Sequence, residues 1–533
     1  MIYEADRMFL TKQNYHQRGE LIMTQGVLPF KYEKEMSGTG MTGLAGLLPY
    51  LDLAQVQGMS TSIEEHIGAR KDSQGWTDSE IILSLVLMNL AGCECVEDLG
   101  KLESDEGFCQ TLAHTYLKLS GMKRKERRDL VKRWRKEKKR TIPSPSAIFR
   151  YLHSFHDPEQ ESLRIPHKAY IPEANGYLNG FTKVNADFLT FLQKNNPERV
   201  ATLDMDATLV ETNKACALFC YKGFRAYQPF NTWWAEQGVI VHTEFRDGNV
   251  PAGFEQLRLL KESLSCLPAG VDVVRVRSDT AGYQHDLLKY CAAGKNERFG
   301  VIEFAIGCDV STDFKKAVLE VSDSEWKPVI KKVRDEEIKT NQEWAEVCFV
   351  PSAIGHSKKG PDYRYIAVRE PMEEQLHLPG IEQDEEQAYP FPSMPIKDRK
   401  YKIFGTVTNM DWDGNELINW QRVRCGKSEE AHSIMKEDLA GGKLPSNDFG
   451  VNAAWWWIMI LSLNLNTAMK TLILGKSWVN RRMKAIRYSL INIPGRIVKR
   501  SRYLIVRLSK NNPMMEWLIE IRAKISMLIP LMA

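Results

Sequence analysis

One stretch of the chain, residues 451–469, constrains the fold more than any other. It contains no charged residue and includes three consecutive tryptophans that begin at Trp455. Its length approaches the roughly 20 apolar residues that a membrane-spanning helix needs. The stretch also carries Asn452, Asn464 and Asn466, which a lipid environment disfavours. The sequence therefore predicts a buried helix inside a large domain, and no membrane partner.

Charge is distributed unevenly along the 533 residues, although the net charge is only +4. Residues 123–140 hold twelve Lys or Arg against three acids, and residues 476–510 hold eleven and no acid. This asymmetry indicates a polyanionic partner such as nucleic acid, with a solvated helical face as the alternative for 123–140. The candidate DNA-binding residues in the two segments are Lys132, Arg133, Arg135, Arg481 and Arg482.

Ten cysteines are scattered along the chain, mostly singly. This pattern is typical of reduced thiols in a cytoplasmic protein and not of a disulfide framework. Cys216 and Cys220 lack a second pair nearby, which disfavours a zinc site. The N-terminus, with Glu4, Asp6 and Arg7, does not read as a signal peptide.

The first part of the chain reads as helical. Apolar periodicity predicts helices over residues 41–57, 78–92 and 96–112, with Thr77 as a candidate N-cap. Ser144, followed by a proline, is expected to begin a further helix. Together with the basic stretch, these helices form a candidate DNA-binding region.

A mixed α/β region follows from about residue 199. Residues 200–210 alternate like a strand, and strands are also expected near 219–227, 238–245 and 271–279. Helices are expected at 253–265 and from 284. Further strand-like runs lie at 301–307, 345–350, 364–369 and 402–408. An acidic, Pro-containing loop is expected at 370–392, and helical periodicity returns from 415.

Three carboxylates lie in positions suited to metal chemistry. Asp206 lies within the strand-like run 200–210, Asp279 closes the run 271–279, and Glu429 opens a helical segment. A carboxylate on a buried strand is costly unless it binds a cation or a hydrogen-bond donor. Converging carboxylates can hold two Mg²⁺ ions, the arrangement that supports in-line phosphoryl transfer.

Each of these acids has an alternative. Asp204 shares a strand face with Asp206, and Glu430 competes with Glu429. Glu429 is preferred because Lys436 lies seven residues on, two helical turns away on the same face, where it could reach a DNA phosphate. The sequence leaves the choice between Glu429 and Glu430 open.

Several ordered segments resemble the DDE-class transposases of bacterial insertion sequences, and the group 1 DDE transposase family in particular, over roughly residues 25–505. The segments that carry the resemblance are 203–209 (LDMDATL), 221–230 (YKGFRAYQPF), 244–252 (EFRDGNVPA), 276–283 (VRSDTAGY) and 424–439 (RCGKSEEAHSIMKEDL).

The resemblance implies a ribonuclease H-like catalytic core with a β-rich insertion, preceded by a helical DNA-binding region. It implies that Asp206, Asp279 and Glu429 form a catalytic triad that holds two Mg²⁺ ions, with Mn²⁺ as a substitute. It further implies cleavage at the terminal inverted repeats and strand transfer into target DNA. The family often has an Arg four residues before the Glu. Here Cys425 stands at that position and Arg424 lies one residue earlier.

The remaining expectations concern organisation and partners. Arg424, Lys427 and Lys436 are expected to contact DNA, and the protein to act as a homodimer on DNA in the bacterial cytoplasm, at the nucleoid. The alternatives are a catalytically inactive DNA-binding relative that acts as a repressor or architectural protein, and a nuclease without strand transfer. The expected divisions are 1–35 (irregular), 36–195 (helical, basic), 196–298 (first part of the core), 299–410 (insertion), 411–475 (C-terminal part of the core) and 476–533 (basic tail).

Overall fold

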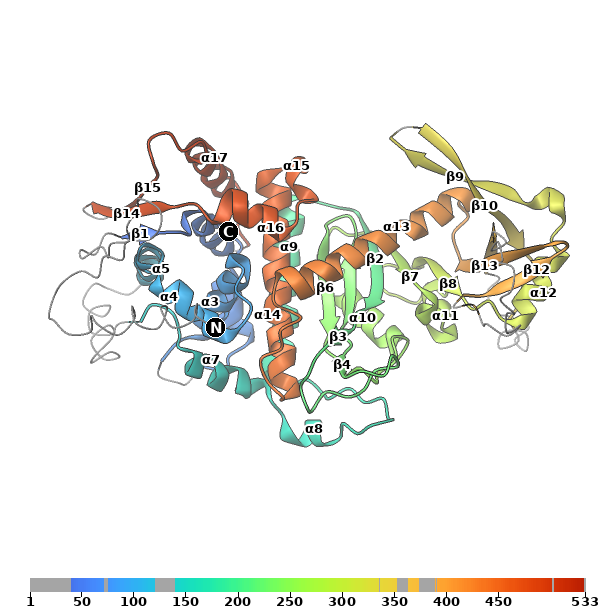
Figure 1. The fold of residues 1–533 in the computed structure, drawn as a ribbon, viewed down its shortest axis with the longest axis horizontal. Helices are drawn as coiled ribbons and strands as arrows, with labels where there is room; N and C mark the ends of the chain where they lie inside the picture. The colour runs from blue at the N-terminus through green and yellow to red at the C-terminus, as the bar shows by residue number, and fades with distance from the viewer. Residues whose placement is uncertain are drawn as a thin grey trace, which may run out of the picture.

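The computed structural model describes residues 40–70, 75–119, 140–334, 336–351, 363–372, 389, 391–500 and 503–531. The chain begins with helices, builds a large sheet, and returns to the first helices at its C-terminal end (Figure 1). Residues 1–35 and the basic residues Lys132, Arg133 and Arg135 lie outside the described residues, as does most of the expected loop 370–392.

The helices fall into three groups along the chain. The first group is α1 (Leu48–Val56), α2 (Met59–His66), α3 (Asp78–Ala91), α4 (Leu99–Ser104), α5 (Glu106–Leu119), α7 (Pro145–Leu152), α8 (Pro158–Ser162) and α9 (Gly176–Asn195). The second is α10 (Gln256–Cys266), α11 (His285–Ala292) and α12 (Thr312–Glu320). The third is α13 (Gly414–Ser433), α14 (Phe449–Ala468), α15 (Lys476–Val479), α16 (Met483–Ile486) and α17 (Met514–Ser526).

A ten-stranded sheet forms the middle of the protein, which is a mixed α/β fold. Strands β2, β7 and β8 are parallel, whereas β5 pairs antiparallel with β2 and β6 antiparallel with β5. The strand order in this half is β6-β5-β2-β7-β8. These strands are β2 (Val200–Ala207), β5 (Phe230–Trp234), β6 (Val239–Glu244), β7 (Val273–Ser278) and β8 (Glu303–Cys308). A small pair, β3 (Val210–Glu211) and β4 (Ala226–Tyr227), lies apart from this sheet.

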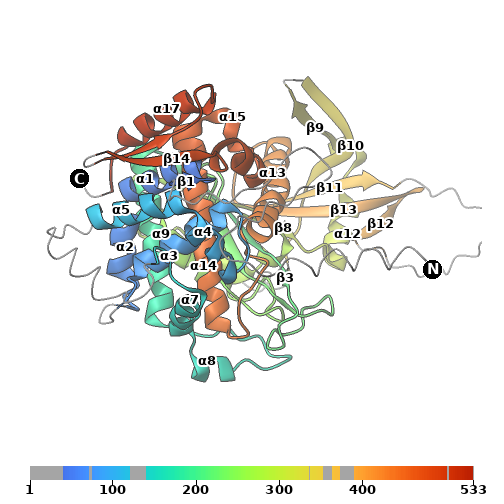
Figure 2. The ribbon, with the colours of Figure 1, turned by 60° about the vertical axis from the view of Figure 1, so that its left-hand side comes forward.

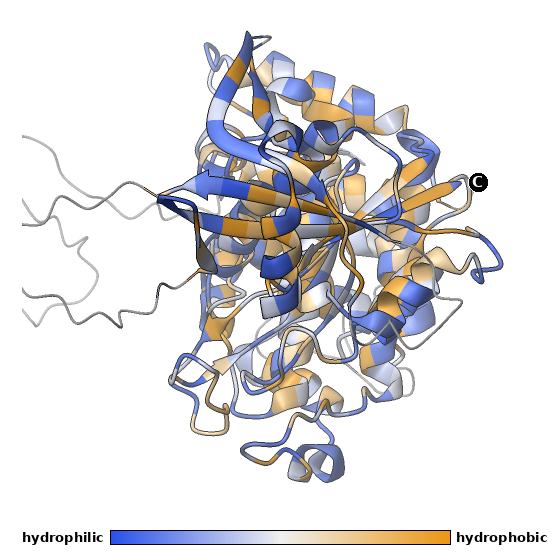
Figure 3. Ribbon diagram, turned by 90° about the vertical axis from the view of Figure 1, so that its right-hand side faces the viewer, coloured by the Kyte–Doolittle hydropathy of each residue, from blue (hydrophilic) through white to orange (hydrophobic). Residues whose placement is uncertain are grey.

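The second half of the sheet comes from the region expected to be a β-rich insertion. It continues from β8 in the order β13-β11-β10-β9, with β12 on β13, and all of these pairs are antiparallel. Seen from this end, the strands carry hydrophilic and hydrophobic residues in turn (Figure 3). The strands are β9 (Lys327–Val333), β10 (Glu336–Val347), β11 (Arg364–Pro371), β12 (Ser393–Ile396) and β13 (Arg399–Thr408).

Helices cover both faces of the first half of the sheet. Asp206 pairs with Asn231 across β2 and β5, so the two side chains share a face, and Arg424 of α13 reaches Asp206 there. Thr232 points to the opposite face, where Ser263 of α10 donates a hydrogen bond to it. α13 and α10 therefore lie on opposite sides of the sheet.

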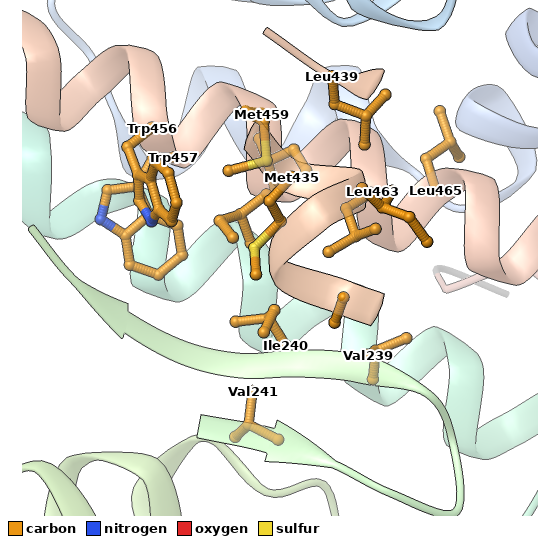
Figure 4. Close-up of a cluster of buried hydrophobic side chains, with 14 of the residues drawn as sticks. Val239, Ile240, Val241, Met435, Leu439, Trp456, Trp457, Met459, Leu463 and Leu465 are labelled. Carbon is orange, nitrogen blue, oxygen red and sulfur yellow. The ribbon is translucent and has the colours of Figure 1, made fainter. Parts of the chain in front are cut away.

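The uncharged stretch forms α14, and every residue of this helix is buried. The segment Phe449–Leu474 is long and apolar enough to cross a membrane, yet 89% of its most apolar window is buried inside the protein. It stands between the first helices and the sheet (Figures 1 and 2). Figure 4 shows Trp456, Met459 and Leu463 gathered above Ile240 of β6. The prediction of a buried helix is confirmed.

Asparagines seal the edge strand β6 against α9 and α14. The Asn464 side chain accepts a hydrogen bond from Ile240 N (2.9 Å) and donates to Ile240 O (2.9 Å). It also donates to Asn185 Oδ1, and Asn185 Nδ2 donates to the carbonyls of Ile240 and Val241. The side chains thus pair backbone groups that an uncovered edge strand leaves open.

Two of the predicted helix starts are confirmed. Thr77 caps α3 in a capping box with Glu80, and Ser144 caps α7 with Pro145 at the first helical position. The strand expected at 219–227 is largely wrong, because only β4 forms there. The longer strand β5 follows β4. It was not predicted, because the consecutive Trp233 and Trp234 hide the alternation of apolar and polar residues that marks a strand.

The C-terminal region is folded onto the first helices. β14 (Gly495–Arg500) pairs antiparallel with both β1 (Met41–Thr42) and β15 (Tyr503–Arg507). Arg522 of α17 forms an ion pair with Asp52 of α1 (2.6 Å). The basic segment is therefore anchored to β1 and α1, near the other end of the chain. The strand pair β14–β15 extends outward from this part of the protein (Figure 1).

Replacement of Asn464 tests whether its hydrogen bonds to the edge strand β6 stabilise the protein. Asn464→Leu keeps a branched side chain but leaves the Ile240 N–H and Asn185 Oδ1 without partners, so we expect a loss of about 2–4 kcal/mol in unfolding free energy. Urea unfolding measures it. Asn341→Ala, at an exposed position of β10, is the control and should change stability by less than about 0.5 kcal/mol. Equal stability of the two variants would contradict the role of the seal.

Candidate active site

Asp206 and Asp279 lie at the carboxyl ends of neighbouring parallel strands. In the β2–β7 register Met205 is opposite Ser278, and each aspartate is the next residue along its strand. Asp206 is the penultimate residue of β2, and Asp279 follows β7 as the N-cap of a short turn, where its Oδ1 accepts a hydrogen bond from Ala281 N. The sheet therefore brings together two acids far apart in the sequence.

Burial dominates the electrostatics of Asp206. It raises the pKa of this carboxyl to about 6, against the opposing effect of the Arg424 guanidinium and with a further upward contribution from the Asp279 charge. Asp279 itself is exposed. When Asp206 and Asp279 are both ionised, the nearby positive charge does not fully compensate their negative charge. A cation would therefore bind favourably between them.

Arg424 is the cation nearest to this pair. Its Nη1 lies 3.2 Å from Asp206 Oδ2, and the side chain is buried. Its Nε atom is buried without a hydrogen-bond partner in the described residues. The displaced arginine noted in the sequence, one position from the family's usual place, therefore does reach the first acid.

Asp204 has a different role from Asp206. It is buried and forms a two-pronged ion pair with Arg277 of β7, with distances of 2.6 Å (Nε–Oδ1) and 2.8 Å (Nη2–Oδ2). Arg277 Nη1 also donates to the carbonyl oxygen of Trp420 on α13 (2.6 Å). This arginine joins β2, β7 and α13, and so sets the position of α13 above the two strand ends.

The two glutamates proposed as the third acid lie on α13. Glu429 is exposed and makes no hydrogen bond or ion pair with any residue that the structure describes. Glu430 is half-buried near Lys470, whose pKa burial lowers and the Glu430 charge raises. Among the described residues, neither glutamate forms a hydrogen bond or ion pair with Asp206 or Asp279. Five residues separate Glu429 from Arg424, about 7.5 Å along a helix axis.

Lys436 lies beyond a change in helix geometry. α13 ends at Ser433 and a π-helical turn runs from Ile434 to Asp438, so the regular two-turn spacing expected between Glu429 and Lys436 does not hold. Lys436 Nζ donates to the Leu209 carbonyl (3.3 Å), just after β2. The side chain therefore lies beside the strand end that carries Asp206.

The pKa of His432 reflects the positive charge along this part of α13. Burial lowers its pKa to about 4, and the Lys436 and Arg424 cations act in the same direction. The imidazole is therefore neutral at pH 7. Sequence reasoning missed this residue, because its environment depends on two cations that only the folded helix brings near it.

An open cavity of about 480 Å³ adjoins Asp279 on the side of the insertion. Asp279, Asp309, Arg422 and Arg424 are among the residues that line it. Asp309 directly follows β8, and sequence reasoning missed it although its position after the strand-like run 301–307 was a usable signal. Among the described residues, no three His, Cys, Asp or Glu side chains form a group that could hold a metal ion.

The remaining DNA-contact candidates are spread over a neighbouring surface. Lys427 Nζ donates to Asn480 Oδ1 (3.2 Å), and the Arg481 guanidinium lies over the Trp478 ring (4.4 Å). Arg482 forms an ion pair with Asp438 (2.9 Å) and so joins the C-terminal region to the π-helical turn. The segment around residue 480 thus packs beside α13.

The family is shown by comparison of sequences. The model of the family described as "Transposase DDE domain group 1" matches residues 30–530, and the chain belongs to this family of transposases. The resemblance carried by the sequence motifs is therefore confirmed. No curated protein matches the chain.

Among solved structures, the chain is similar to the piggyBac transposase in the cryo-EM structure of its synaptic complex with hairpin DNA. The two share 13% sequence identity, the match covers 90% of this chain and 85% of that chain, and the TM-score is 0.39. A TM-score of this size does not establish a common fold.

The raised pKa of Asp206 predicts a pH-dependent stability. Its folded pKa of about 6 exceeds the roughly 3.9 of an unfolded aspartate, so stability present below pH 4 is lost as the pH rises through 6. Asp206→Asn removes this cost while an amide oxygen still accepts from Arg424. We expect the unfolding free energy of the variant to exceed that of wild type by up to about 3 kcal/mol at pH 7. Near pH 4 the two unfolding free energies should be equal.

Urea unfolding in EDTA at several pH values measures this difference. Asp398→Asn, at an exposed position, is the matched control and should follow wild type within about 0.5 kcal/mol at each pH. A variant that is less stable than wild type at pH 7 would show that the Arg424 contact outweighs the cost of burial.

Proposed function

We propose that this transposase binds the terminal inverted repeats of an insertion sequence, cleaves DNA there with the help of divalent metal ions, and joins the freed 3′ end to target DNA. The observation that carries the proposal is the meeting of Asp206 and Asp279 at adjacent parallel strand ends beneath α13. Family membership supports the same reaction class.

We infer that the first half of the sheet is a ribonuclease H-like core. Its order β6-β5-β2-β7-β8, with three parallel and two antiparallel strands, supports this inference. α10 and α11 lie in the connections between β6, β7 and β8. In this division, the core comprises residues 196–298 and 411–475. β8 lies beyond residue 298 but pairs with the core strand β7.

Two acids, Asp206 and Asp279, fit a divalent metal, whereas the described residues bring no third acid into one group with them. Carboxylate oxygens are the hard ligands that Mg²⁺ prefers, and the uncompensated charge of Asp206 and Asp279 favours a cation between them. These two acids would hold the metal together with Glu429, or Glu430 in its place. When bound, two Mg²⁺ or Mn²⁺ ions would supply Lewis acidity and lower the pKa of the attacking hydroxyl.

The chain's own residues position the DNA. Arg277 fixes α13 over the strand ends through Asp204 and the Trp420 carbonyl. Arg424 offsets part of the Asp206 charge. Lys436, beside Leu209, and Lys427 are placed to contact phosphates along the same helix.

The C-terminal segment 476–510 supplies a second DNA contact in this proposal. It holds no acid, and its strands β14 and β15 form a ribbon on which Arg496 and Arg507 are cross-strand neighbours. Arg500 pairs with Tyr503 at the far end, and both Tyr503 and Arg507 are exposed. Arg481 adds to this surface, whereas Arg482 is held by Asp438. Binding should weaken steeply with salt.

Two DNA ends have to be joined in one event, so we propose that the protein acts as a homodimer on DNA at the nucleoid. The 36–195 helices and the 123–140 segment would share in recognising the ends. A catalytically inactive relative that binds DNA as a repressor or architectural protein is the alternative.

Cleavage of a labelled DNA that carries the element's own ends tests the proposed function. With Mg²⁺, wild type should nick the ends, whereas Asp206→Ala and Asp279→Ala should lower the rate by on the order of 1000-fold, equivalent to about 4 kcal/mol of transition-state stabilisation. Glu429→Ala, Glu430→Ala and Asp309→Ala identify the third acid, because only one of them should match the aspartate variants.

Every variant is first shown to bind the same DNA. Asp398→Ala serves as a control that should keep full activity. Wild type that binds the ends but never cuts them with Mg²⁺ or Mn²⁺ would favour the repressor or architectural alternative. Nicking without end joining would favour a nuclease without strand transfer.

Metal binding itself predicts a second observable. Millimolar MgCl₂ should raise the melting temperature of wild type by about 1–3 °C relative to EDTA at equal ionic strength. Asp206→Asn should remove this shift, since it deletes a charged ligand. Thermal unfolding without DNA measures both, and an equal shift in the variant would place the metal elsewhere.

A further inference from the structure

Two aromatic side chains are exposed on one short loop. Residues 212–225, here named the aromatic loop, connect β3 to β4, and they carry Phe219 (57% exposed) and Tyr221 (78% exposed). Single exposed aromatics are common, but two on one short loop place unusual apolar area in contact with solvent.

The aromatic loop is built to hold these rings in place. Backbone hydrogen bonds cross it from Cys220 N to Phe224 O (2.9 Å) and from Ala226 N to Leu218 O (3.1 Å). Arg225 Nη1 donates to two carbonyls of the loop, and Ala217 and Cys220 are buried beneath it. The exposed rings therefore sit on a fixed support, which lowers the entropy cost of binding a ligand.

Positive charge surrounds the two rings. The loop contains Lys214, Lys222 and Arg225 and no acid. The Arg225 guanidinium lies 4.7 Å from the centre of the Phe219 ring, and Lys222 Nζ lies 5.7 Å from that of Tyr221. Aromatic faces beside cations are the combination that binds single-stranded nucleic acid, where bases stack and the cations meet phosphates.

The loop lies next to the candidate active site. Residues 208–211, which include β3, connect the loop to the end of β2, which carries Asp206, and Lys436 donates to the Leu209 carbonyl in this connection. Burial lowers the pKa of Lys436, and the Lys222 charge acts in the same direction. A DNA strand that contacts Lys436 is therefore within reach of the loop.

We propose that Phe219 and Tyr221 stack on unpaired bases of the DNA beside the cleavage site, so that the aromatic loop distinguishes opened DNA from intact duplex. This inference rests on the proposed function. A protein partner would also bury the rings, but the three cations and the absence of acid in the loop favour a nucleic acid.

The test compares two DNAs of the same sequence in EDTA, where no cleavage occurs. One is a blunt duplex, and the other is a fork with a few unpaired nucleotides and 2-aminopurine at the junction. Wild type should bind the fork about 5-fold to 100-fold more tightly, as expected for one or two stacked bases, and quench the 2-aminopurine emission. Phe219→Ala/Tyr221→Ala should bind both DNAs equally and lose the quenching.

Two variants separate stacking from other effects. Tyr221→Phe keeps the ring and should retain the preference for the fork. Lys222→Met removes charge and should weaken binding of both DNAs to the same extent. An unchanged melting temperature of the double variant shows that it folds, as the exposure of both side chains leads us to expect.

The outcomes separate this inference from the proposed function. Equal binding of fork and duplex by wild type, or a preference that survives the double substitution, would overturn the role of the aromatic loop alone. Failure of wild type to bind either DNA would instead contradict the proposed function. Loss of both the preference for the fork and the quenching in Phe219→Ala/Tyr221→Ala supports the inference.

Discussion

The sealing of the edge strand β6 is the interaction on which the rest of the structure depends. Asn464 and Asn185 pair with Ile240 in place of a further strand, and this fixes α14 and α9 against the sheet. The other sides of α14 are then available to the first helices, including Tyr50 of α1, whose hydroxyl donates to Asn466. The same helix thus holds the N-terminal helices against the sheet that carries the candidate site.

Asp204 and Asp206 lie two residues apart on β2, but they differ in how fully an arginine satisfies each carboxylate. Arg277 meets Asp204 with two hydrogen bonds and completes its set of contacts at Trp420, so this ion pair is structural. Arg424 meets Asp206 with one contact and leaves its own Nε unpaired. The first pair is closed to further ligands, whereas the second retains unused capacity on both partners. This difference, and not burial alone, separates a positioning carboxylate from a candidate metal ligand.

Local patterns predicted much of the fold and part of the site. The asparagines within 451–469 favoured a buried helix, and strand alternation placed Asp206 at a polar face, both of which depend only on neighbouring residues. The strand β5 was missed because consecutive tryptophans hide the alternation. The position of Lys436 relative to Glu429 could not be predicted, because a π-helical turn from Ile434 to Asp438 breaks the regular helical spacing.

The insertion separates the two aspartates from α13 in the sequence but continues the same sheet in space. During synthesis, the strands that carry Asp206 and Asp279 leave the ribosome well before the helix that is to cover them. α14, which closes the sheet edge, follows later still. A chain interrupted within the insertion would therefore retain the first helices but lack Arg424 and both candidate glutamates. The proposed site is therefore complete only once α13 has been synthesised and has packed on the sheet.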